Sequence, residues 1–288
     1  MRVLLLGASG QLGSDIVRLW RDPAVTLIPA TRADADVTDS AATGRLVARV
    51  NPDLVINTTA FHNLPQAEAN PETCFRVNVL GGWHVARAAR SCSAAVVQIS
   101  TDYVFDGTKR TPYLEDDARR GVNVYGSAKV ATEDVVRQAN PDSLIVRVSG
   151  LYGVAGSAGK GGNFVETMLR LAREGNPIRV VSDQVTAPTN TAEIAEALLP
   201  AVRHGIRGAI HLAASGGGCS WHEFAAAIFA IAGIEPDLRA VSTAEFAAPL
   251  DRPMYSVLGT TRVPTLGHWH SGLERYMREK YPGGVPAH

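Results

Sequence analysis

Short apolar runs alternate with amphipathic segments through the first half of the chain, and this alternation constrains the fold more than any other feature. The runs VLLL, VTLIPA, LVINTT, AAVVQIS and LIVRVSG occupy residues 3–6, 25–30, 54–59, 94–100 and 144–150. Such nearly continuous runs are typical of strands buried on both faces of a parallel sheet. Helical patterns lie between them, at residues 11–20, 40–49, 72–90 and 125–138. The sequence therefore predicts an α/β fold with a doubly wound parallel sheet, whose ligands bind at the carboxyl ends of the strands.

Composition argues against several classes of partner. The 288 residues include 28 Lys and Arg and 28 Asp and Glu, so the formal net charge is zero, and no run of basic residues occurs. Neither nucleic acid nor a membrane surface is therefore expected as the main partner. Cys74, Cys92 and Cys219 lack the spacing of metal ligands, and we predict reduced thiols in a cytoplasmic protein. No apolar run is long enough for a signal peptide or for a bilayer span.

A glycine-rich turn, GASGQLG, follows the first predicted strand directly. Its glycines stand at positions 7, 10 and 13. Glycine lets the backbone turn tightly and approach a diphosphate without a Cβ atom in the way, and the following helix would direct free N–H groups at the phosphates. We predict a dinucleotide site here, with a simple strand–helix turn as the alternative. The predicted cofactor-binding residues of the turn are Gly7, Ser9, Gly10, Gln11 and Leu12.

The end of the second predicted strand, ATRADADVTD, indicates which dinucleotide binds. NAD sites usually place an acidic residue there to bind the ribose hydroxyls. This chain has Thr31 and Arg32 instead, and a guanidinium suits the 2′-phosphate of NADP. We therefore predict NADPH, with NADH left open, and a solvated surface arginine is the other interpretation of Arg32. The remaining predicted cofactor contacts are Asp36 and Val37 around the adenine, Thr59, Ala60 and Phe61 after the third strand, and, later in the chain, Tyr125 and Lys129.

The segment NVYGSAK places Tyr125 and Lys129 four residues apart, on one face of a predicted helix. A cation beside a phenol favours its ionised form, so Lys129 would lower the pKa of Tyr125 until it exchanges a proton near neutral pH. Thr101 ends the fourth predicted strand, in STDYVFDG, and would donate a hydrogen bond to the same substrate oxygen. We predict that these three residues are catalytic, with hydride from the cofactor and the proton from Tyr125. The alternative is an exposed helical contact between Tyr125 and Lys129.

The pattern changes after about residue 155, where a glycine-rich loop begins. We predict a dinucleotide-binding domain over residues 1–155, with a strand and a helix contributed by later segments, and a smaller substrate-binding lobe over residues 156–288. Further helices are predicted at 163–174, 192–202 and 221–233, and strands at 178–181 and 209–213. His211, Trp221 and His222 are predicted to be structural.

On these motifs the chain resembles the dTDP-4-dehydrorhamnose reductase family of the extended short-chain dehydrogenase/reductase superfamily. The segments PDLVINTTAF, AEANPETCFRVNVLG, GNFVETMLRLA, DQVTAPT and RPMYSVL join those quoted above in the order of that family. The resemblance implies a Rossmann-like fold, the catalytic triad Thr101, Tyr125 and Lys129, and reduction of a 4-keto group on a nucleotide-activated deoxysugar. It also implies a possible homodimer. The dimer of the family is linked by magnesium through acidic residues, for which Asp15 and Glu193 are candidates, but we predict no metal site.

The predicted substrate contacts are Asp102, Tyr103, Gly150, Asn163, Phe164 and Arg252. Asn163 and Phe164 would contact the diphosphate or the base of the substrate, or else act as a helix N-cap and a core aromatic residue. Arg252 would pair with a phosphate, or else form a structural ion pair.

Two departures from the family fall on the substrate side. Pro65 and Gln66, in HNLPQAE, replace an Asp–Lys pair, and Gly150 replaces a tryptophan. The sequence therefore supports the type of reaction better than the identity of the sugar.

Two other functions stay open at this point. The same motifs resemble the non-catalytic, NADP-binding regulatory subunit of methionine adenosyltransferase, which has less chemical need for a catalytic triad. A sugar-nucleotide epimerase or dehydratase is the other alternative. A dehydratase generally needs acidic groups beside the strand-end hydroxyl, and only Asp102 is available there.

Overall fold

A six-stranded parallel sheet forms the centre of the structure, a computed structural model that describes residues 1–156, 161–247 and 250–285. The strand order is β10-β5-β4-β3-β1-β2, and every neighbouring pair is parallel. The strands are β1 (Arg2–Leu6), β2 (Thr26–Ala30), β3 (Leu54–Asn57), β4 (Ala95–Thr101), β5 (Ser143–Val148) and β10 (Gly208–His211). The predicted α/β class with a doubly wound parallel sheet is confirmed.

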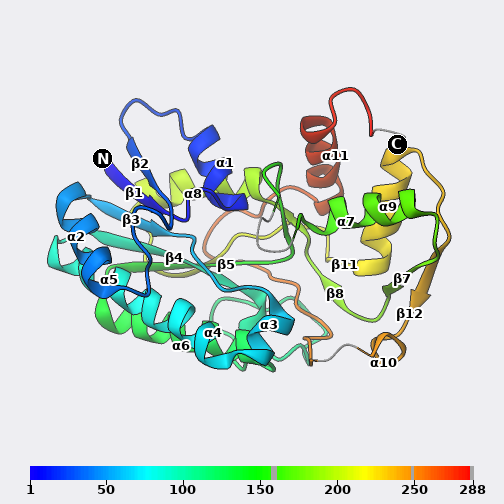
Figure 1. Cartoon of the computed structure of the whole chain (residues 1–288), viewed down its shortest axis with the longest axis horizontal. Helices are drawn as coiled ribbons and strands as arrows, with labels where there is room; N and C mark the ends of the chain where they lie inside the picture. The colour runs from blue at the N-terminus through cyan, green and yellow to red at the C-terminus, as the bar shows by residue number, and fades with distance from the viewer. Residues whose placement is uncertain (157–160, 248–249, 286–288) are drawn as a thin grey trace.

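Helices cover both faces of this sheet (Figure 1). They are α1 (Gln11–Leu19) and α8 (Thr191–Arg203) on one face, and α2 (Ser40–Val50), α5 (Gly81–Ser91) and α6 (Val124–Ala139) on the other. Side chains of β1 alternate between the two cores. Val3 and Leu5 pack with Ile16 of α1, whereas Leu4 and Leu6 belong to the core on the opposite face. Because both faces of the strand are buried, its sequence is apolar throughout.

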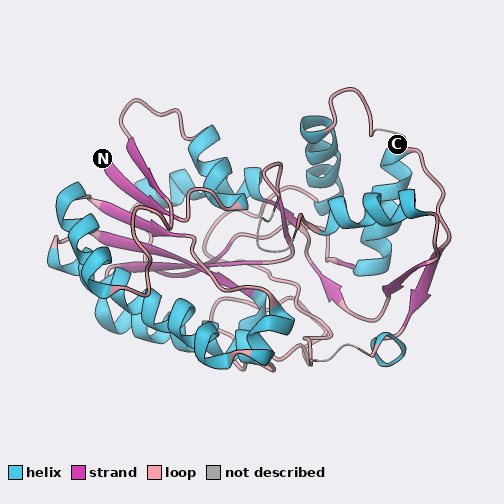
Figure 2. Ribbon diagram, viewed as in Figure 1, coloured by secondary structure: helices cyan, strands magenta, loops and turns pink. Residues whose placement is uncertain are grey.

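A smaller lobe with its own core follows β5, and Figure 2 shows it as a separate group of helices and short strands. Phe224, Leu273 and Tyr276 lie at the centre of this core and have no exposed surface. Its main elements are α7 (Phe164–Glu174), β7 (Ile178–Val181), α9 (Trp221–Ala232), β12 (Leu238–Val241), α10 (Thr243–Phe246) and α11 (Trp269–Lys280). Short strands complete the fold: β6 (Leu151–Tyr152), β8 (Val185–Thr186), β9 (Thr189–Asn190) and β11 (Cys219–Ser220).

The chain returns to the main sheet after entering the lobe. The predicted helix 192–202 is α8, which packs beside α1, and the predicted strand 209–213 is β10, which pairs with β5. These are a helix and a strand contributed to the first domain by later segments. The division at residue 155 itself stays a prediction. No helix in the described ranges is long and apolar enough to cross a membrane.

The single helix predicted over residues 72–90 is wrong in one respect. After α3 (Leu64–Ala69), the chain forms α4 (Pro71–Phe75), then a π-helical segment, η1 (Arg76–Leu80), and only then α5. A π-turn contains one residue more than an α-turn and is common at functional sites. Here it accompanies the inward placement of Asn78, whose side chain accepts from the Phe61 N–H and donates to the Phe61 carbonyl, each at 3.0 Å.

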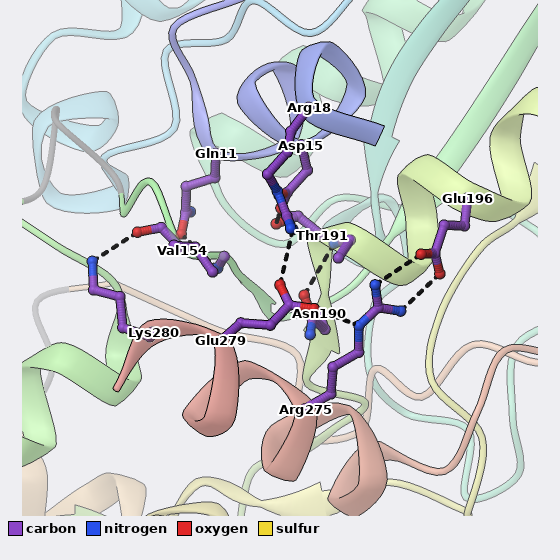
Figure 3. Close-up of polar contacts among 12 residues, drawn as sticks. Gln11, Asp15, Arg18, Val154, Asn190, Thr191, Glu196, Arg275, Glu279 and Lys280 are labelled. Atoms are coloured by element: carbon purple, nitrogen blue, oxygen red, sulfur yellow. Dashed lines mark hydrogen bonds and ion pairs between the residues drawn. The ribbon is translucent and has the colours of Figure 1, made fainter. Parts of the chain in front are cut away.

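Helix α11 ties the lobe to the helices of the main sheet (Figure 3). Both outer nitrogens of Arg275 bind the carboxylate of Glu196 in α8, at 2.7 and 2.8 Å. Glu279 accepts from Arg18 of α1 at 2.9 Å. Lys280, at the end of the helix, donates to the Val154 carbonyl at 2.7 Å. One helix therefore holds α1, α8 and the start of the lobe together.

Candidate active site

The glycine turn lies where the chain reverses direction across the sheet, between the carboxyl ends of β1 and β3. Gly7 has a φ of +81°, and a Cβ atom there would lie 2.5 Å from the Thr58 hydroxyl oxygen. A Cβ atom at Gly13 would clash with the Gly7 carbonyl oxygen. Strand β3 therefore packs against this turn so closely that only glycine fits. Such a switch point is where dinucleotides bind in doubly wound sheets.

The first turn of α1 fits a diphosphate. Gly10 is the N-cap of the helix, and no side chain caps its N–H groups. Uncapped N–H groups and the positive end of the helix dipole together favour an anion. Ser9 and Gly10 are exposed, as contact with a cofactor requires. Leu12 is buried in the core instead, and the Gln11 side chain accepts from the Gly153 N–H at 3.2 Å. Cofactor contacts of Leu12 and Gln11 stay predictions.

Arg32 stands on the surface after β2, with 88% of its side chain exposed, and pairs with Asp36 at 2.9 Å. The Asp36 carboxylate also accepts from the N–H and the hydroxyl of Thr38, and these bonds lower its pKa. The Arg32 guanidinium is therefore accessible to a 2′-phosphate, whereas the Asp36 carboxylate is already engaged. The predicted contact of Asp36 with adenine stays a prediction, as does that of Val37, which is 6% exposed.

Two buried asparagines hold the loop after β3, which contains the predicted contacts Thr59, Ala60 and Phe61. The Thr59 hydroxyl donates to Asn57 at 2.6 Å, and Phe61 is fixed through its backbone by Asn78. Sequence analysis missed both asparagines. A polar residue such as Asn78 within a predicted helix was the available signal, because a buried amide needs hydrogen-bond partners.

Thr101 and Tyr125 meet at the carboxyl end of β4, where a hydrogen bond joins them, and Lys129 follows Tyr125 by four residues in α6. Lys129 is 2% exposed, and its Nζ donates to the Ile99 carbonyl oxygen at 2.6 Å. Burial lowers the pKa of Lys129 to about 8. Tyr125 differs from our expectation, because its pKa is raised. Burial of the phenol is the main cause, the Asp102 carboxylate adds to it, and a hydrogen bond with Thr101 opposes it. Tyr125 is therefore protonated at neutral pH, as a free tyrosine would be, but it is a weaker acid than the expected tuning by Lys129 would make it.

Asp102 lies beneath this group rather than facing an open site. It is 2% exposed and accepts from the Thr101 hydroxyl and the Ser149 hydroxyl, each at 2.9 Å. A hydrogen bond with Ser256 adds a third hydroxyl, while burial raises the pKa of the carboxyl. This environment does not favour a contact of Asp102 with the substrate, and that contact stays a prediction. Asp102 also differs from the exposed acid that a dehydratase needs.

Tyr103 and Arg252 converge beside Tyr125. The rings of Tyr103 and Tyr125 meet edge to face, with centroids 6.0 Å apart. Burial raises the pKa of Tyr103 to about 12, and the positive charge of Arg252 opposes this rise. The Arg252 Nε is buried and has no hydrogen-bond partner in the part of the chain that the structure describes. The residue as a whole is half-buried, and a guanidinium with a free donor is suited to an anionic ligand.

Asn163 and Phe164 take the structural roles that the sequence left open. Asn163 caps α7 by accepting from the Glu166 N–H at 3.0 Å, and its amide donates to Gly153 and Tyr276 at 3.1 Å. The Phe164 ring packs on Trp221, with centroids 4.7 Å apart. These contacts occupy both side chains, so their binding of substrate stays a prediction without support from the geometry.

Gly150 follows β5 with a φ of +53°, and a Cβ atom there would lie 3.0 Å from the Pro188 Cα. A larger side chain would therefore be strained at this position. Pro65 and Gln66 are exposed at the start of α3.

Of the acidic residues considered for magnesium, Asp15 lies near α11 in Figure 3, and the Glu193 carboxylate lies beside Gly272 of that helix. Asp15 accepts from Thr191 and from Arg18. One buried oxygen of Glu193 has no hydrogen-bond partner among the residues that the structure describes, and burial raises the pKa of its carboxyl. Within the described residues, no group of three or more His, Cys, Asp or Glu side chains could hold a metal ion. His211 is buried against Arg147, at 3.2 Å, and the Gly259 carbonyl oxygen, at 2.7 Å.

Comparison with known proteins identifies relatives over nearly the whole chain. The model of the family "RmlD substrate binding domain" matches residues 1–281. A dTDP-4-dehydrorhamnose reductase of Mycolicibacterium smegmatis is 37% identical over 280 residues, which are 95% of this chain and 84% of that protein. A dTDP-4-keto-6-deoxy-D-glucose reductase of Streptomyces niveus is 36% identical over 279 residues, 94% of this chain and 95% of that protein. A crystal structure of dTDP-4-dehydrorhamnose reductase from Bacillus anthracis in complex with NADP has a TM-score of 0.91 at 33% identity, covering 96% of this chain and 99% of that one.

Proposed function

Because this chain belongs to the RmlD substrate binding domain family, we propose for it the reaction of its reductase relatives: NADPH-dependent reduction of a 4-keto group on a nucleotide-activated deoxysugar. The observation that carries this proposal is the group formed by Thr101, Tyr125 and Lys129 at the carboxyl end of β4. It lies at the same edge of the sheet as the glycine turn, which can hold a dinucleotide.

The side chains of this chain would handle the proton of the reaction, while the bound dinucleotide supplies a hydride. The Tyr125 phenol carries its proton at neutral pH, so its hydroxyl can give a proton to the carbonyl oxygen of the substrate. Lys129 would stabilise the phenolate that remains, since a nearby cation favours an anion. The Ile99 carbonyl holds that ammonium in place. Asp102 orients the Thr101 hydroxyl.

The named relatives favour a reductase over the two alternatives. A regulatory subunit would not need the buried lysine, which costs stability. A dehydratase would need an accessible acid beside Thr101, whereas the Asp102 carboxylate is 2% exposed and bound to hydroxyls. A nucleotide sugar is the proposed partner. A cytoplasmic location and a homodimer stay predictions.

The test is hydride transfer by the purified protein. NADPH oxidation is followed at its absorbance band with a panel of 4-keto sugar nucleotides, and the product is identified by mass and by NMR. We expect turnover of at least one compound by the wild type and its near loss in Tyr125→Phe. Absence of turnover with every compound, from a protein that binds NADPH, would favour the regulatory subunit.

A further inference from the structure

Residues 251–258, DRPMYSVL, form a segment that we call the strap, and it packs against the loop after β4. Gly107 in that loop has a φ of +78°, and a Cβ atom there would lie 2.5 Å from both the Met254 nitrogen and the Pro253 Cα. On its other side the strap bonds to β8: the Val185 N–H donates to Met254 at 2.9 Å, and the Ser256 N–H donates to Val185 at 2.8 Å. The backbone from Pro253 to Ser256 is therefore fixed between two elements.

The beginning of the strap is held differently, by the side chain of Asn123. This residue is the N-cap of α6 and is 8% exposed. Its Oδ1 accepts from the Gly126 N–H at 2.8 Å, which starts the helix. Its Nδ2 donates to the Asp251 carbonyl oxygen at 2.9 Å. One amide therefore fixes the backbone just before Arg252 and also the helix turn that presents Tyr125.

We propose that Asn123 is a positioning residue for substrate binding, because it holds the strap so that the Arg252 guanidinium stands beside Tyr103 and Tyr125 to bind the diphosphate of the nucleotide sugar. The inference rests on the proposed function, and it assigns to the N-cap of α6 a role beyond capping.

Holding the arginine through its backbone suits an anion site. A carboxylate that gripped the guanidinium directly would compete with the diphosphate for the same N–H donors. A hydrogen bond to the neighbouring carbonyl leaves those donors free, in agreement with the buried Nε of Arg252 that lacks a partner among the described residues. Arginine also loses side-chain freedom when it binds, so a fixed backbone reduces the entropic cost of binding.

The two functions of Asn123 can be separated by substitution. Serine is as good an N-cap as asparagine, but it has no amide to donate to Asp251. Asn190 offers a matched control. It caps α8 by accepting from the Ala192 N–H at 3.0 Å and donates to the Gly272 carbonyl at 3.1 Å, so it performs the same double task in contact with α11 instead of the strap.

The experiment measures binding and turnover in parallel. Wild type, Asn123→Ser, Asn190→Ser and Arg252→Ala are titrated calorimetrically with dTDP, UDP and GDP, and steady-state constants follow for the best nucleotide sugar. We expect Asn123→Ser to raise the Kd of the preferred diphosphate and the KM of the sugar nucleotide by roughly 3- to 10-fold, the range for one lost hydrogen bond. The kcat and the Kd of NADPH should stay within about twofold of wild type, because the cap and Tyr125 are retained. Asn190→Ser should leave all these constants within about twofold, whatever it does to Tm.

Coupling identifies the residue that Asn123 positions. In an Arg252→Ala background, Asn123→Ser should weaken diphosphate binding by less than about twofold, since non-additive effects mark residues that act together. Two results would overturn the inference on Asn123 and leave the proposed function standing. One is an equal loss of diphosphate affinity from Asn123→Ser in both backgrounds. The other is an unchanged Kd in Asn123→Ser when Arg252→Ala binds the diphosphate weakly. A wild type that binds none of the three diphosphates overturns the proposed function with it. If Asn123→Ser is unstable, Asn123→Asp keeps the cap, lacks the donor and must give the same loss.

Discussion

The buried ammonium of Lys129 determines how stability should depend on pH. Burial lowers the pKa of this group from its ordinary value of 10.5 to about 8 in the folded protein. Between these values the unfolded chain still holds a proton that the folded protein has released. The free energy of unfolding therefore rises as the pH rises through this window, and below it the full cost of burying the charge is present. The gap corresponds to about 3 kcal/mol, at about 1.36 kcal/mol for each pKa unit.

Lys129→Met is the perturbation that isolates this effect. Methionine keeps most of the side-chain length but cannot titrate. Unfolding by urea is followed by tryptophan fluorescence from about pH 7 to about pH 9.5, below the range in which tyrosines of the unfolded chain ionise. Over this range the free energy of unfolding of the wild type should rise by about 2 kcal/mol more than that of Lys129→Met.

A constant difference in the free energy of unfolding between the two proteins does not test the argument, because the substitution also removes the hydrogen bond to Ile99. Only the difference in slope tests the argument. Groups other than Lys129 that titrate in this range are common to both proteins, so their contributions cancel. Parallel curves for wild type and Lys129→Met would show that the ammonium is not desolvated in the folded protein. The interpretation of Lys129 as a buried cation beside the active site would then be refuted.

Three further outcomes test the cofactor, the proton donor and the sugar. Tyr125→Phe should fold normally and bind NADPH with nearly unchanged affinity, while turnover falls by roughly 10²–10⁴-fold. A variant that keeps more than about a tenth of wild-type turnover would exclude Tyr125 as the proton donor. Arg32→Ala should weaken NADPH binding by roughly 10- to 100-fold and NADH binding much less, because it removes a charge-assisted contact with the 2′-phosphate. Equal losses of affinity for the two cofactors in fluorescence titrations would contradict that contact. Because Gly150, Pro65 and Gln66 depart from the family, dTDP-4-dehydrorhamnose should be reduced less efficiently than another 4-keto sugar nucleotide, and a kcat/KM equal to the best of a panel would count against this.

The sequence predicts the sheet well because burial on both faces leaves a simple signal. Strands β1, β3, β4 and β5 are each apolar over nearly their whole length, so their positions follow from composition alone. Helix α11 was not predicted. Its polar face forms the ion pairs of Arg275 and Lys280, and only the partners of these residues, which lie far away in the sequence, explain its place. The short strand β12 likewise depends on pairing with β7.

Spacing in the sequence placed the predicted catalytic residues Tyr125 and Lys129 on one helix, but it did not reveal the electrostatics of their surroundings. Residues four apart share a helix face, so Tyr125 and Lys129 were expected together. The pKa of Tyr125 depends instead on how much water the surrounding elements exclude, which no local pattern reveals. The roles of Asn78 and Asn123 were missed for a similar reason. Each amide bonds to the backbone of a segment that is distant in the sequence.

The hydroxyl of Thr101 has only one proton to donate. Its choice of acceptor gives a reason for the buried Asp102 carboxyl and for the other hydroxyls that bind it. In the structure the Thr101 hydroxyl donates to Asp102, and a hydrogen bond with Tyr125 lowers the pKa of the phenol, so Thr101 favours the phenolate. Once Tyr125 has given its proton away, the phenolate needs a donor, and the Thr101 hydroxyl can supply one. Asp102 also accepts from Ser149 and bonds with Ser256. It therefore stays hydrogen-bonded when Thr101 turns its proton toward the phenolate. A carboxyl with no other donor would resist that change, because an unpaired buried anion is costly.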